Sequence, residues 1–319
     1  KEFLDKDNLN NSIKKDLYTG FMPSNYVLSE TEIQLTFEYI DSKEKLLLPL
    51  FFKTLIDDIL IDDIDNYTNY LYDTYSSRSN SLKKLFSSIY SIPNVPIEIV
   101  SKYYTRAYTA TSPFNSDINK NLGQNKIDKY ITFIKTLYEG VKLSALPLCN
   151  DKFLYRGAKI SNDEIIKING YLKNKIENLP SSIVFCRSFL SFSKLKSVAE
   201  YFLGFQNKDK NLFKVLFILE KDDKVEYNLA THADIENISV IPSEKEVLFF
   251  PFSSFEIKDI KPIKINDNET FYEIYLLYLG KYLKYVENDE NIKKSEDIIG
   301  ESEFKKQLIE SCLIKKEKI

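Results

Sequence analysis

Apolar side chains recur at helical spacing in several segments of the chain. The segments are Leu82, Leu85, Phe86 and Ile89; Ile127, Ile131, Ile134, Tyr138 and Val141; and Ile165, Ile168, Leu172 and Ile176. Residues three or four positions apart share one face of an α-helix, so each segment predicts an amphipathic helix. Residues 49–64 predict a further helix, because the run PLFFKTLIDDILIDDI begins with a proline, which fits the first helical turn.

Strand-like segments dominate the later part of the chain. Short runs rich in β-branched and aromatic residues lie at 32–40, 153–157, 183–193, 212–219, 244–252, 255–260 and 270–279. Such a composition is typical of β-strands. Because helices come early and strands come late, the order predicts an α+β fold with antiparallel or mixed sheets, and not a regularly alternating parallel sheet.

A pair of prolines marks the clearest boundary. The run IPNVP at 92–96 contains both, and proline clusters punctuate helices and strands. We therefore predict a mainly helical N-terminal segment over residues 1–95 and a second domain over residues 96–319. The chain length of 319 residues agrees with this division, since domains average about 150 residues.

The composition excludes several classes of function. Lys+Arg 44 against Asp+Glu 47 gives a net charge of -3, which provides no basic field, so we expect no nucleic-acid partner. The run LLLPLFF at 46–52 is far shorter than the roughly 18 apolar residues of a membrane helix, so we expect a soluble chain without a membrane span. The 8 glycines form no GxG pattern, which excludes a Rossmann fingerprint and a phosphate loop.

Cysteine and histidine are too sparse for common metal sites. Cys149, Cys186 and Cys312 are odd in number and far apart, which argues against a disulfide framework and a zinc knuckle and favours a reducing compartment. His232 is the only histidine, so an HExxH site is excluded. We expect no metal, and we interpret His232 as a structural residue.

A pair of glutamates precedes one of the most apolar segments, in the run SEKEVLFFPF at 243–252. Residues two apart in a strand project from the same face, so Glu244 and Glu246 are predicted to share one pocket while Lys245 points away. Repulsion between two carboxylates raises the pKa of one of them, and such pairs are enriched at functional sites. Taken alone, the pair also fits a solvated strand end.

Two further motifs come earlier in the chain. LYRG at 154–157 contains Arg156 at the end of a strand-like segment, and FLSFS at 189–193 contains Ser191 and Ser193. The chain thus has, in order, an arginine, a serine motif and a Glu-x-Glu pair before an apolar strand. This order resembles the Arg-Ser-Glu class of mono-ADP-ribosyltransferases.

Longer segments extend the resemblance. The runs at 103–122, 233–257 and 272–282 are similar to segments of that family, so the resemblance covers the chain from about residue 97 onward. It implies the mono-ADP-ribosyltransferase fold, in which two packed mixed or antiparallel β-sheets with flanking helices hold NAD between them. Residues 96–319 would form the catalytic domain. Residues 1–95 could recognise the target, cover the cleft or pack as a helical extension.

The resemblance also assigns roles to residues around the arginine and the second glutamate. Glu246 matches the catalytic glutamate, which would accept a hydrogen bond from the ribose and stabilise the developing cation. Arg156 would bind the phosphates or the adjacent ribose. Gly157 would let the backbone approach the nicotinamide carboxamide, and Tyr155, two residues before it, would also bind NAD.

The serine motif matches the family's Ser-Thr-Ser. Ser191 corresponds to the first serine, which would orient the glutamate, and Ser193 corresponds to the last. Phe192 replaces the central threonine and is predicted to point away from the serine face. Phe202 lies where the family places an aromatic ring against nicotinamide, but its helical spacing fits an ordinary core residue equally well.

The implied activity is transfer of ADP-ribose from NAD to arginine side chains of a protein. In this family a glutamate at the position of Glu244 accompanies arginine acceptors, so Glu244 is expected to handle the incoming guanidinium. An NAD glycohydrolase with water as acceptor and a non-catalytic binding module remain open. NAD is the expected substrate, with no metal, and the expected location is cytoplasmic, including a host cytosol if the chain is a bacterial effector.

Overall fold

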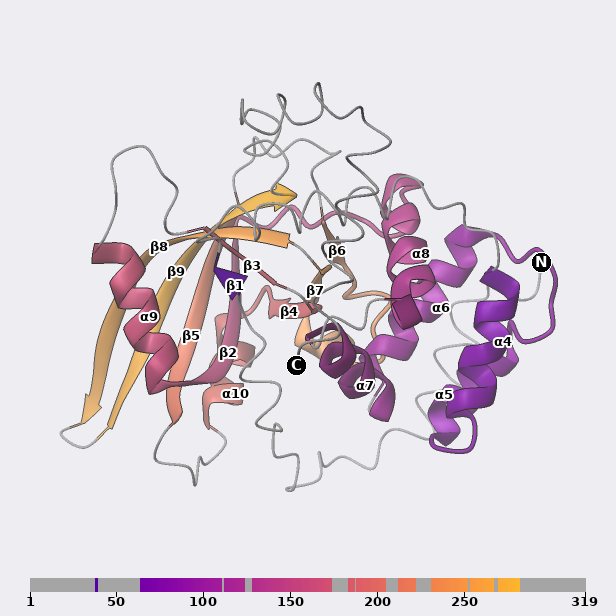
Figure 1. Cartoon of the computed structure of the whole chain (residues 1–319), viewed down its shortest axis with the longest axis horizontal. Helices are drawn as coiled ribbons and strands as arrows, with labels where there is room; N and C mark the ends of the chain where they lie inside the picture. Colours follow the sequence, from indigo (N-terminus) through magenta and orange to yellow (C-terminus); the bar gives the residue numbers. More distant parts are fainter. Residues whose placement is uncertain are drawn as a thin grey trace, which may run out of the picture.

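The structure, a computed structural model, describes residues 38–39, 64–110, 112–123, 128–173, 183–186, 188–204, 212–221, 231–251, 253–266 and 269–281. Figure 1 shows helices α4 to α8 on one side of the molecule and the long strands on the other. Most helices precede most strands, and the sheet is mixed, which confirms the predicted α+β class. Within the described residues, no helix has the length and apolar character needed to cross a membrane.

The helical layer consists of α4 (Ile64–Tyr75), α5 (Asn80–Ser87), α6 (Ile97–Thr109), α7 (Pro113–Gly123) and α8 (Ile131–Lys142), with a 3-10 turn at Asp128–Tyr130. Helix α5 begins after Ser79, whose Oγ accepts a hydrogen bond from the N–H of Leu82 at 3.3 Å. It buries Leu82, Leu85 and Phe86, as the periodicity predicted. Ile89 lies in the turn after the helix and is also buried.

The other two periodic segments are helices as well. Helix α8 buries Ile134, Tyr138 and Val141, and α9 (Asn162–Lys173) buries Ile165 and Ile168, so both predictions are confirmed. Parts of the predicted helices lie outside the described residues: Ile127, Ile176 and residues 49–63.

The strands form one sheet in the order β1-β3-β8-β9-β5-β2-β4-β7-β6. They are β1 (Glu38–Tyr39), β2 (Phe153–Ser161), β3 (Ile183–Phe185), β4 (Leu190–Ser193), β5 (Leu212–Lys221), β6 (His232–Asp234), β7 (Glu246–Phe249), β8 (Ser253–Asn266) and β9 (Glu269–Lys281). Strands β5 and β9 pair in parallel, and the other neighbours pair antiparallel. Each strand-like run of the later sequence therefore contains a strand.

The resemblance implied two packed sheets, whereas the structure has one hydrogen-bonded sheet with two parts, β1-β3-β8-β9-β5-β2 and β4-β7-β6. The two parts join through a single residue pair, Tyr155 on β2 opposite Ser193 on β4. They still pack against each other, because the ring of Phe249 on β7 lies 5.6 Å from Phe255 on β8 and 5.2 Å from Tyr278 on β9. A shared apolar core therefore lies between the two parts of the sheet.

Helix α10 (Lys196–Gly204) packs against β2 at Gly157. A Cβ atom on Gly157 would lie 2.1 Å from the carbonyl oxygen of Ala199, so a side chain has no room at this position. The glycine thus allows the helix to approach the strand that carries Arg156.

The N-terminal segment is described in part. Helices α4 and α5 contribute to the same apolar core as α6 and α8, which also contains Leu248 and Phe250 from the β7 region. Residues 38 and 39 of the predicted strand at 32–40 pair with β3, and the rest of that run lies outside the described residues. The domain boundary at residue 95 stays a prediction.

Candidate active site

Three strands bring Arg156, Ser191 and Glu246 together. Arg156 comes from β2, Ser191 from β4, and Glu246 is the first residue of β7. Arg156 Nη1 donates a hydrogen bond to the Ser191 carbonyl oxygen at 2.9 Å, and Ser191 Oγ donates to Glu246 Oε1 at 2.5 Å. One serine therefore connects a guanidinium to a carboxylate.

Glu246 is almost completely buried, with 7% of its surface exposed. Burial raises its pKa, and three neighbours oppose this effect: a hydrogen bond from Ser191, the positive charge of Arg156, and a hydrogen bond from Ser239. The net result is a raised pKa. Attraction between a carboxylate and a nearby positive charge is stronger in such a low-dielectric environment than in water.

Ser239 is a residue of this site that the sequence reasoning missed. It is buried in the segment between β6 and β7, and its Oγ also accepts a hydrogen bond from the N–H of Ile241 at 3.1 Å. The run DIENISVIP at 234–242 has no strand or helix periodicity that would direct attention to it. A serine between two apolar residues, Ile238 and Val240, was the available signal.

Glu244 does not lie on a strand, so the prediction that it shares a strand face with Glu246 is wrong. Pro242 starts a 3-10 turn that ends at Glu244, and Lys245 adopts a left-handed conformation with φ of 49° before β7 begins. The repulsion expected between the carboxylates of Glu244 and Glu246 is nevertheless present. Burial, and then the negative charge of Glu246, raise the pKa of Glu244 to about 7.

Ser193 supports the turn that carries Glu244. Its Oγ donates to the Glu244 carbonyl oxygen at 2.7 Å and accepts a hydrogen bond from the N–H of Leu195 at 3.0 Å. The predicted contact between Ser193 and NAD stays a prediction, while the structure gives this hydroxyl a role in holding the turn.

The remaining predicted NAD-binding residues lie along β2 and α10. Tyr155 is half-buried and packs with Ala199 and Leu203 of α10. Gly157 lies against the same helix. Phe202 is half-buried on α10, with its ring 6.0 Å from that of Tyr201. The roles of Tyr155, Gly157 and Phe202 toward NAD stay predictions.

Phe192 and His232 point into the core. Phe192 is 2% exposed and its ring lies 5.3 Å from that of Phe249, so the prediction that it points away from the serine face is confirmed. His232 stacks on Phe249 at 5.2 Å and its Nδ1 lies 3.3 Å from the Tyr278 hydroxyl. Burial lowers the pKa of His232 to about 3, as expected of a structural, neutral histidine.

Among the described residues, one group could hold a metal ion: potential ligand atoms of Cys149, Asp151 and Asp234 lie within 4.8 Å of one another. The ammonium of Lys194 contacts Asp234 and lies 3.9 Å from Asp151. Burial raises the pKa of the Cys149 thiol to about 11, which favours the neutral form over the thiolate that a metal requires. The positive charge of Lys194 therefore already compensates the carboxylates of Asp151 and Asp234.

No protein-family model and no curated protein matches the chain. Among solved structures, the chain is similar to the ADP-ribosyltransferase HopU1 of Pseudomonas syringae pv. Tomato DC3000, with 16% identity and a TM-score of 0.42 over 76% of this chain and 100% of that chain. The Vis toxin, an ADP-ribosyltransferase from Vibrio splendidus, has 21% identity and a TM-score of 0.32 over 76% of this chain and 88% of that chain.

A third similar structure is Plx2a, an ADP-ribosyltransferase toxin from Paenibacillus larvae, with 16% identity and a TM-score of 0.40 over 66% of this chain and 96% of that chain. All three bear the name of the family that the sequence motifs resemble.

Proposed function

We propose that the chain is a mono-ADP-ribosyltransferase that moves ADP-ribose from NAD to arginine side chains of a protein acceptor. The observation that carries the proposal is the hydrogen-bonded group Arg156, Ser191 and Glu246, assembled from three strands. A guanidinium beside a buried carboxylate suits a substrate in which phosphates lie next to a ribose that becomes positively charged.

The reaction breaks the bond between C1′ of the ribose and the nicotinamide nitrogen. Nicotinamide leaves with the bonding electron pair, so the ribose passes through an oxocarbenium-like state, as in glycoside hydrolysis. Glu246 stabilises this positive charge, and the Ser191 hydroxyl fixes the orientation of the carboxylate. Arg156 binds the phosphates, for which a planar guanidinium with several donors is better suited than an ammonium.

The acceptor step needs a second group. A guanidinium nitrogen forms the new bond to C1′ only if it loses a proton, and its own pKa lies above about 12. Glu244, whose pKa is raised to about 7, takes that proton, since a base with a pKa near the working pH is effective at neutral pH. Tyr155, Gly157 and Phe202 line the nicotinamide side of the substrate in this proposal.

The test uses NAD labelled in its phosphates, an arginine-containing peptide and a matched peptide with lysine in place of arginine. We expect label on the arginine peptide alone, with at least one nicotinamide released per label and the ADP-ribose located on arginine by mass spectrometry. Nicotinamide and free ADP-ribose without peptide labelling would replace the proposal with an NAD glycohydrolase. Intact NAD would leave only a binding role.

A further inference from the structure

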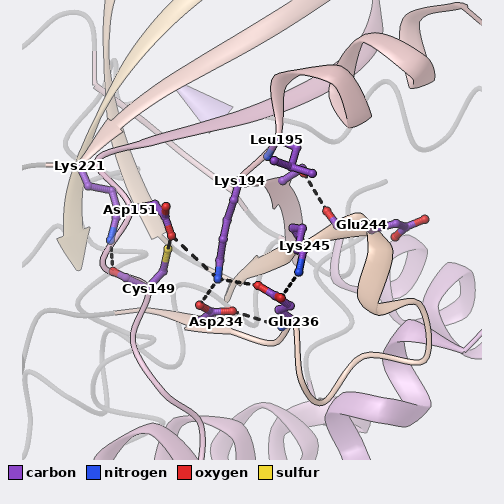
Figure 2. Close-up of polar contacts among 10 residues, drawn as sticks. Cys149, Asp151, Lys194, Leu195, Lys221, Asp234, Glu236, Glu244 and Lys245 are labelled. Carbon is purple, nitrogen blue, oxygen red and sulfur yellow. Dashed lines mark hydrogen bonds and ion pairs between the residues drawn. The ribbon is translucent and has the colours of Figure 1, made fainter.

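The turn that carries Glu244 is attached to the end of β4. Ser193 Oγ donates to the Glu244 carbonyl oxygen at 2.7 Å, and the N–H of Lys194 donates to the Lys245 carbonyl oxygen at 3.1 Å. The carbonyl oxygens of Glu244, the last residue of the turn, and of Lys245, which follows it, thus accept hydrogen bonds from the consecutive residues Ser193 and Lys194. Figure 2 shows the Glu244 side chain directed away from this attachment.

The side chain of Lys194 contacts the beginning of the segment that leads from β6 to this turn. Its Nζ contacts Asp234 at the end of β6 and lies 3.1 Å from Glu236, just after that strand (Figure 2). Lys194 is largely buried, with 17% of its side chain exposed. Burial lowers its pKa, but the hydrogen bonds to Asp234 and Glu236 outweigh burial and raise the pKa above its ordinary value.

Lys194 therefore contacts both ends of the segment from Asp234 to Lys245. Its backbone N–H donates to the carbonyl oxygen of Lys245, next to β7, and its ammonium contacts the carboxylate of Asp234, at the end of β6. The ammonium of Lys245 also contacts Glu236, which adds a contact across the segment. Opening of the segment would break at least one of the contacts of Lys194.

We propose that Lys194 is a positioning residue that holds the Glu244 turn in place for the protein acceptor. This inference rests on the proposed function and extends it, because it assigns acceptor specificity to a residue outside the Arg156, Ser191 and Glu246 group. The contacts of the Lys194 ammonium are with carboxylates of the segment and with Asp151. Its loss should therefore disturb the acceptor step and spare cleavage of NAD by water.

The first test compares Lys194→Met with Lys196→Met. Lys196 lies two residues further on, and its side chain is 46% exposed, with the ammonium 3.7 Å from Glu200 and 3.5 Å from Glu273. We expect Lys194→Met to lower arginine labelling by about tenfold or more, since misplacement by about 1 Å can cost about a hundredfold. Nicotinamide release with water as acceptor and the KM for NAD should stay within about threefold. Lys196→Met should leave both activities unchanged.

Lys194→Arg retains the positive charge and should recover part of the labelling. Equal labelling by Lys194→Met and the wild type would overturn the positioning role while leaving the proposed function intact. So would equal losses of labelling and of nicotinamide release, because they would indicate a general structural role.

A second test does not depend on activity. The N–H groups of Glu244 and Lys245 donate to the carbonyl oxygens of Ile241 and Pro242 within the turn. In Lys194→Met, hydrogen exchange at these two amides should become faster, while exchange in β7 stays unchanged. Unchanged exchange at the turn would refute the positioning role, and a wild type that releases no nicotinamide from NAD would instead refute the proposed function.

Discussion

Ser191 donates a hydrogen bond to Glu246 at 2.5 Å although the two residues are not directly opposite in the sheet. The β4–β7 register places Ser193 opposite Glu246 and Ser191 opposite Leu248. Diagonal neighbours on one face of an antiparallel pair are within reach of longer side chains, and glutamate spans the gap. The two serines consequently have different roles, since Ser191 orients the Glu246 carboxylate while Ser193 holds the Glu244 turn.

Arg156→Lys should weaken NAD binding. The guanidinium donates to the Ser191 carbonyl oxygen through one of its five N–H groups, whereas an ammonium that keeps this contact cannot also present a planar fork to phosphates. We expect the affinity for NAD, measured by calorimetry, to fall by about tenfold, as for loss of a charge-assisted hydrogen bond. Unchanged affinity would exclude the phosphate-binding role of Arg156.

Glu244→Ala should separate the two acceptors. Without this carboxylate the arginine nitrogen has no base, so labelling of the arginine peptide should fall by about a hundredfold or more, within the range of general base catalysis. Nicotinamide release with water as acceptor should continue at a measurable rate, because Glu246 is retained. Labelling at the wild-type rate would contradict the role of Glu244, and so would a complete loss of hydrolysis.

The ratio of labelling to hydrolysis should depend on pH. Glu244 acts as a base only when deprotonated, and its pKa is raised to about 7, so the active form increases as the pH rises through 7. We expect the ratio to rise between about pH 6 and pH 8 and then to level off. A pH series of both rates on the same samples measures it. A flat ratio over this range would show that the proton of the acceptor leaves by another route.

Two glycine substitutions should change stability in opposite directions. Gly157→Ala would place Cβ 2.1 Å from the Ala199 carbonyl oxygen, so we expect a loss of about 1–3 kcal/mol, as in other overpacked sites. Gly170→Ala in α9 meets nothing within 4 Å and should gain about 0.5–1 kcal/mol from helix propensity. Urea unfolding of both variants gives the comparison. A neutral Gly157→Ala would refute the close approach of α10 to β2.

Much of the fold could be predicted from the sequence because burial imposes regular periods. The apolar positions of α5, α8 and α9 repeat every three or four residues, and Phe192 alternates away from its neighbouring serines. Pairing between distant strands leaves no such period. The single pair between Tyr155 and Ser193, which makes one sheet of the expected two, depends on long-range packing that no local pattern shows.

The candidate site was predictable where strands carry it and not where a turn does. Arg156, Ser191 and Glu246 lie on strands, and the structure brings them together as one hydrogen-bonded group. Glu244 was expected on a strand because the alternating pattern of β7 was extended two residues before its true start at Glu246. Pro242 instead favours the turn that ends at Glu244. Ser239 was missed since it lies in the irregular segment between β6 and that turn, which has no regular period.

The most direct measurement of the central claim is nicotinamide release from NAD by the wild type and by Glu246→Gln. The amide keeps the size of the side chain but removes the negative charge that stabilises the oxocarbenium-like state. We expect release to fall by about a hundredfold or more while the affinity for NAD changes by less than about threefold, because the charge acts mainly in the transition state. Glu200→Gln, at an exposed carboxylate on α10, is the matched control and should behave as the wild type. Release by Glu246→Gln within about threefold of the wild type would contradict the account.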